Sequence, residues 1–60
     1  MKVEEKARFF ELRKKLMKGE INHVEAVELK ALLEKMKEEA KTSFEKQFFK
    51  VTELELNEVL

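Results

Sequence analysis

The sequence predicts an all-α fold: an antiparallel helical hairpin that dimerises into a four-helix bundle. Three observations support this prediction. The chain has no proline and a single glycine, Gly19, so only one position strongly favours a break between helices. Charged and apolar residues each make up 43% of the chain, and glutamate and lysine, both good helix formers, dominate the charged set. A 60-residue chain buries little surface, and without cysteine it has no disulfides, so oligomerisation is the expected source of further stability.

The first helix is predicted from about residue 3 to about residue 18. On a helical wheel of about 100° per residue, its apolar residues fall on two roughly opposite faces. A helix in a two-helix hairpin needs only one apolar face, so we predict that this helix contacts two neighbours. One face contains Val3, Ala7, Phe10 and Met17, and the other contains Phe9, Leu12 and Leu16.

A turn is predicted at residues 19–22. Gly19 tolerates the left-handed conformation that ends many helices, and Lys15 and Lys18 place positive charge near the last carbonyl groups. Asn22 can cap a new helix, and Glu25 three residues later completes a capping-box pattern. Local chemistry therefore predicts both sides of this turn.

The second helix is predicted from about residue 23 to about residue 50. Thr42 and Ser43 could cap a new helix, but the apolar stripe continues in phase through Phe44, so we predict one long helix, bent near Thr42 at most. A short patch formed by Val24, Val27 and Ala31 is assigned to the contact with the first helix, and the long stripe to another partner. The sequence also allows the opposite assignment. The long stripe contains Leu29, Leu33, Met36, Ala40, Phe44, Phe48 and Val51.

The C-terminal segment, residues 51–60, fits two structures. Thr52 followed by Glu55 resembles a capping box and favours a short helix, whereas the alternation of Leu54 and Leu56 with glutamates favours a strand. We favour the helix. In either form the segment carries five apolar residues and is expected to dock onto the rest of the single domain, residues 1–60.

The composition argues against several functions. The chain has no Cys, Asp, Tyr or Trp, one histidine (His23), one serine (Ser43) and no glycine-rich loop, so we predict no enzyme activity, no metal and no cofactor. No apolar run reaches the length of about 18 residues that a membrane span needs, and we expect a cytoplasmic protein. The net charge is zero, although residues 1–18 hold seven bases against three acids.

Two functions are compatible with these features. The first is a small regulatory or adaptor protein that binds itself and another protein through an exposed helical face. The alternative, ranked second, is a nucleic-acid-binding regulator that uses the basic first helix, and it would depend on a dimer that aligns two such helices. The residues predicted to bind a protein partner are Phe44, Phe48, Phe49, Leu54 and Leu56, with Phe49 the strongest candidate because it lies off the main stripe. The residues that would bind nucleic acid are Arg8, Arg13, Lys14, Lys15 and Lys18.

Overall fold

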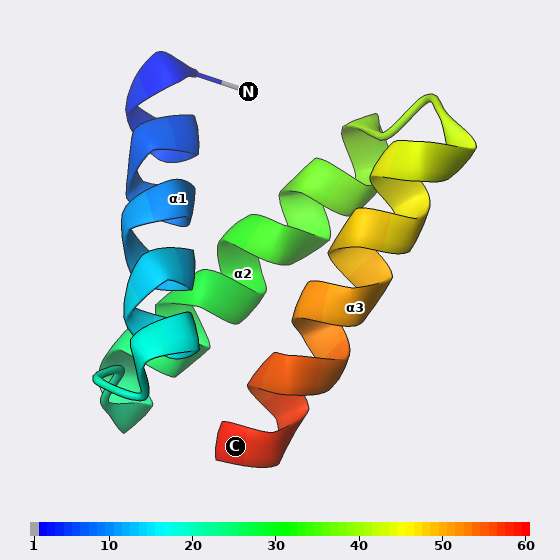
Figure 1. The fold of residues 1–60 in the computed structure, drawn as a ribbon. Coiled ribbons are helices and arrows are strands. Elements are labelled where there is room, and N and C mark those ends of the chain that lie inside the picture. The colour runs from blue at the N-terminus through cyan, green and yellow to red at the C-terminus, as the bar shows by residue number, and fades with distance from the viewer. Residues whose placement is uncertain (1) are drawn as a thin grey trace.

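The computed structural model describes residues 2–60 and contains three helices over that range. They are α1 (Val3–Lys18), α2 (His23–Glu39) and α3 (Ser43–Val59), and no strand occurs among the described residues. The all-α prediction is confirmed. Figure 1 shows that α2 runs back from the end of α1 and that α3 runs back again alongside α2. α1 and α3 therefore point the same general way, and they touch each other least.

The first helix and the turn have the predicted bounds. Gly19 has a φ of 72°, and its N–H donates to the carbonyl of Leu16 at 3.1 Å, which closes the end of α1. The Asn22 side chain accepts a hydrogen bond from the backbone N–H of Glu25 at 2.8 Å, and the Glu25 carboxylate accepts one from the N–H of Asn22 at 3.2 Å. This is the predicted capping box.

The prediction of one long helix from about residue 23 to about residue 50 is wrong. α2 ends at Glu39, and Ala40 has an extended backbone with φ −67° and ψ 128°. Thr42 then caps α3, because its side-chain oxygen accepts a hydrogen bond from the backbone N–H of Glu45 at 3.1 Å. The cap that the sequence offered is therefore used, and the chain is a three-helix unit instead of a two-helix hairpin.

Burial of apolar side chains explains why the chain breaks here. The turn lets α3 fold back against α2, and this places Phe49 and Leu56 in the core. A helix that continued straight past residue 42 would carry both side chains away from the other helices and into water. Burying a side chain of this size stabilises the fold by about 1.5–3 kcal/mol, more than a helix gains by avoiding one break.

Residues 51–59 continue α3, so the C-terminal segment is helix and not strand. Leu54 and Leu56 lie on different sides of it, and Leu54 is 58% exposed whereas Leu56 is fully buried. Thr52 does not cap a helix. It is buried within α3, where its hydroxyl donates to the carbonyl of Phe48 at 3.0 Å and so has a partner inside the core.

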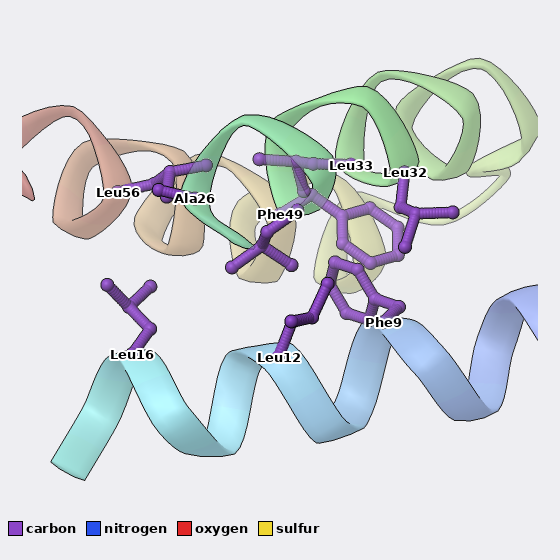
Figure 2. Close-up of a cluster of buried hydrophobic side chains, with 9 residues drawn as sticks. Phe9, Leu12, Leu16, Ala26, Leu32, Leu33, Phe49 and Leu56 are labelled. Carbon is purple, nitrogen blue, oxygen red and sulfur yellow. The ribbon is translucent and has the colours of Figure 1, made fainter. Parts of the chain in front are cut away.

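One hydrophobic core lies between the three helices, as Figure 2 shows. The ring of Phe9 from α1 meets that of Phe49 from α3 edge to face, with centroids 6.1 Å apart. Because α1 meets α2 and α3 with a single side, its core residues all lie on one of the two apolar faces predicted for it. The buried apolar residues are Phe9, Leu12, Leu16, Ala26, Leu29, Leu32, Leu33, Phe49 and Leu56.

Two apolar surfaces that the sequence assigned to packing are exposed in the single chain. The other apolar face of α1, with Phe10 and Met17, is exposed. The patch on α2 formed by Val24, Val27 and Ala31 is also exposed and does not pack on α1. The side of α2 that carries the leucines supplies more apolar area, and a helix in a three-helix unit buries only one side. The patch therefore lies on the outside of α2.

Candidate functional site: an exposed apolar face on α1 and α3

Four exposed apolar side chains of α1 and α3 lie on sides of these helices that do not pack into the core. Phe10 is 53% exposed, and Met17, seven residues later, lies on the same side of α1. Phe44 is 80% exposed, and Val51, again seven residues later, lies on the same side of α3. We call the surface formed by these four side chains the α1/α3 face.

The two halves of this face meet at a pocket of about 240 Å³. Phe10 comes to the pocket from α1, and Phe44 and Phe48 come to it from α3. Met36 of α2 and the edge of Phe49 also line the pocket. The pocket is therefore mostly apolar, and residues of all three helices line it.

Arg13 joins α1 to α3 beneath the face. Its guanidinium carbon lies 4.6 Å from the centre of the Phe48 ring, a cation–π contact. The Nε atom of Arg13 is buried and has no hydrogen-bond partner among residues 2–60. Phe48 in turn meets Phe49 edge to face, with centroids 5.5 Å apart. The α1/α3 face is itself joined to the core through Phe10, whose ring meets that of Phe9 edge to face with centroids 5.4 Å apart.

The structure separates the five residues predicted to bind a protein partner. Phe44 and Leu54 are exposed, and Phe48 is half-buried. Phe49 and Leu56 are core residues, so the expectation that Phe49 is the side chain most available to a partner needs correction. Phe49 lay off the apolar stripe predicted for one long helix. In the structure it belongs to α3, and it lies on the side of α3 that faces the core.

Sequence reasoning missed the contribution of Phe10, Met17 and Val51 to an exposed surface. The signal was present, because the first helix has more apolar faces than a hairpin can cover. The prediction assigned both apolar faces of the first helix to packing contacts within the assembly. In the single chain, one of these faces forms the core and the other is exposed.

The five basic residues of the alternative function do not form one surface. Arg8 is held by Glu28 through two hydrogen bonds of 2.7 and 3.1 Å, and Lys15 is paired with Glu25. Arg13 packs on Phe48. Lys14 and Lys18 are exposed and have no ion-pair partner in the part of the chain that the structure describes. Carboxylates of α2 therefore pair with two of these five basic residues.

Ion pairs between helices shift several pKa values. Hydrogen bonds from Lys15 and Arg8 lower the pKa of Glu25 and Glu28, respectively. The same contact raises the pKa of Arg8. Hydrogen bonds from Lys35 and Lys37 lower the pKa of Glu5 and Glu53, and the pKa values of both lysines rise. These pairs tie α1 to α2 and α2 to α3.

Acid is expected to destabilise the fold through these carboxylates. Their pKa values are lower in the folded chain than the ordinary 4.5, so the stability they contribute is present above pH 4.5 and is lost as the pH falls through the lowered values. The lysines act in the opposite range, because their raised pKa values contribute stability that is lost only as the pH rises above 10.5. Melting temperatures followed by circular dichroism should therefore fall as the pH drops below 4.5.

A pair of variants isolates this effect. Glu28→Gln should lower the melting temperature at pH 7 and reduce its further fall in acid, because the Arg8 contact no longer depends on a carboxylate charge. Glu20→Gln, at an exposed position in the turn, should leave the pH profile unchanged. Identical profiles for the two variants would contradict the role of the Arg8–Glu28 pair.

Among residues 2–60, no helix is long and apolar enough to cross a membrane. Over the same range, no three side chains of His, Cys, Asp or Glu gather in a way that could hold a metal ion. No known protein family, curated protein or solved structure matches the chain.

Proposed function

We propose that this chain is a protein–protein interaction module that acts as a homodimer, with the α1/α3 face as the interface. Two copies that meet through this face would bring α1 and α3 of one copy against α1 and α3 of the other, as a bundle of four helices. The four-helix arrangement expected from the sequence would then arise from two three-helix units instead of two hairpins. Such a dimer would carry two copies of every surface outside the interface, and a small regulator or adaptor would use these surfaces to bind another protein. A cytoplasmic location stays a prediction from the sequence.

The observation that carries this proposal is the exposure of aromatic side chains from two helices around one pocket. Phe10 and Phe44 line the same apolar pocket, yet each leaves at least half of its surface in water. A 60-residue protein has few aromatic residues for its core, and exposing two of its five phenylalanines costs burial that it could have used. Contiguous apolar surface of this kind usually marks an interaction site.

A second copy of the chain fits this face in charge. Lys14 lies one turn from both Phe10 and Met17, with Lys18 one turn further along α1, whereas Glu55 and Glu58 lie one and two turns past Val51 on α3. A standard interface buries about 800 Å² per partner, which is about a fifth of the 4448 Å² surface of this chain. The acidic residues beside Val51 would repel nucleic acid from the same face, so they favour a protein partner.

Sedimentation equilibrium over a roughly hundredfold range of concentration would test the proposal, because self-association depends on concentration. We expect a dimer at the upper end and a melting temperature that rises with concentration. The double variant Phe10→Ala/Phe44→Ala should weaken the dimer by at least about tenfold. The matched control Val24→Ala/Val27→Ala removes exposed apolar side chains from α2 and should dimerise like the natural chain.

Three results would overturn the proposal. The first is a chain that stays monomeric at every concentration. The second is a pair of double variants that behave alike. The third is a monomer that binds duplex DNA or RNA with an affinity falling steeply with salt, which would support the alternative function instead.

A further inference from the structure

The charges around the α1/α3 face specify how two copies would meet, an inference that rests on the proposed dimer. Lys14 and Lys18 lie in the C-terminal half of α1, and Glu55 and Glu58 lie in the C-terminal half of α3. Figure 1 shows both halves at the same end of the molecule, because α1 and α3 point the same general way. The face therefore has a basic side and an acidic side at one end.

None of these four side chains is used within the single chain. Lys14, Lys18 and Glu58 are exposed and Glu55 is half-buried, and over residues 2–60 none of them takes part in an ion pair. The contrast with their neighbours is informative, because Lys15 pairs with Glu25 and Glu53 pairs with Lys37 on the sides that face α2. These charges on the sides that face α2 are paired, whereas the four near the α1/α3 face are available to another molecule.

We propose that the homodimer is parallel, with α1 of each copy packed on α3 of the other and the twofold axis running along the helices. This arrangement brings like ends together, so Lys14 and Lys18 of one copy meet Glu55 and Glu58 of the other, and symmetry forms the same contacts twice. The competing arrangement, with α1 packed antiparallel on α1 of the second copy, would bring basic helices together and pair acidic α3 helices. Like charges in an interface select against that geometry.

The apolar contacts agree with the same arrangement. Phe10 and Met17 form an exposed apolar stripe on one helix, and Phe44 and Val51 form one on the other. When α1 lies over α3 of the second copy, each apolar stripe is covered by a stripe of the other kind. The pocket between Phe10 and Phe44 then lies within the interface.

Complementary charge reversal tests this geometry. Lys14→Glu/Lys18→Glu and Glu55→Lys/Glu58→Lys should each weaken the homodimer by at least about tenfold, because every favourable pair at the interface becomes a repulsive one. Mixing the two variants in equal amounts should restore a dimer that contains one copy of each. Native mass spectrometry distinguishes this mixed dimer from either homodimer by mass, and sedimentation velocity measures its affinity.

A control variant accounts for the change in net charge. Lys30→Glu/Lys50→Glu alters the net charge as much as the first variant does, but Lys30 is on α2 and Lys50 lines a pocket with residues of α2. It should dimerise like the natural chain. Circular dichroism of each variant at low concentration would show that the single chain still folds.

The outcomes separate the two proposals. If the natural chain is monomeric, the proposed dimer and its geometry both fail. If the natural chain dimerises but the mixture forms no mixed dimer in preference to homodimers, the dimer stands and this geometry fails. Stronger self-association of Lys14→Glu/Lys18→Glu would point to the antiparallel arrangement of two α1 helices and would also overturn the geometry.

Discussion

Replacing Phe9 with alanine is expected to unfold a large share of the protein at room temperature. Phe9 is fully buried, and its ring contacts Phe49 across the core. Removing a buried phenylalanine costs about 3–5 kcal/mol, whereas a domain of 60 residues has a total stability of only about 3–9 kcal/mol. Urea titration followed by circular dichroism would measure this loss.

The neighbouring phenylalanine provides a matched control. Phe10 is next to Phe9 in the sequence but half of its side chain lies in water. We expect Phe10→Ala to change the free energy of unfolding of the single chain by about 1 kcal/mol or less when it is measured at low concentration, where a dimer does not contribute. Equal losses for the two variants would mean that α1 does not bury the face that carries Phe9.

Replacing Leu56 with alanine is expected to cost about 2–5 kcal/mol. Leu56 is fully buried although it lies only four residues from the C-terminus of the chain. A large effect here would show that the last turns of α3 belong to the core. Urea titration again gives the free energy of unfolding.

Leu54 is the control for this prediction. It is in the same helix and is 58% exposed, so Leu54→Ala should change the stability by no more than about 1 kcal/mol. A strand would place both leucines on one face, and both changes would then have similar effects. Similar losses for Leu54→Ala and Leu56→Ala would therefore contradict the helical structure of this segment.

The break at Thr42 connects the fold to the proposed function. If the chain had formed one long helix, Phe44, Phe48 and Val51 would have extended the stripe of α2. Because α3 folds back, the same residues lie beside α1, and Phe44 shares a pocket with Phe10. The α1/α3 face is thus a product of the turn between α2 and α3, and it joins residues that are far apart in the sequence.

Much of the local structure could be predicted from the sequence. The bounds of α1, the left-handed conformation of Gly19 and the capping box of Asn22 and Glu25 all follow from interactions within about four residues. The all-α class follows from composition and from the absence of proline. These features need no knowledge of what the helices pack against.

The exposed face could be predicted only in part. Phe44 and Leu54 were expected to be available to a partner, and both are exposed. Phe49 and Leu56 were grouped with them, yet both are buried, because the number of apolar residues in a segment does not reveal which of them face the core. Phe10 and Met17 were recognised as a second apolar stripe but were assigned to packing.

The sequence by itself determined the helical class, the first turn and the two apolar stripes of α1. The tertiary structure decided whether Thr42 would end a helix, which stripe of α1 would be buried and which side of α2 would meet its neighbours. Caps and helical periodicity depend on residues only a few positions apart, so they can be recognised in the sequence alone. The choice between two apolar faces depends on the total area that all three helices bury together, and that quantity exists only once the chain has folded.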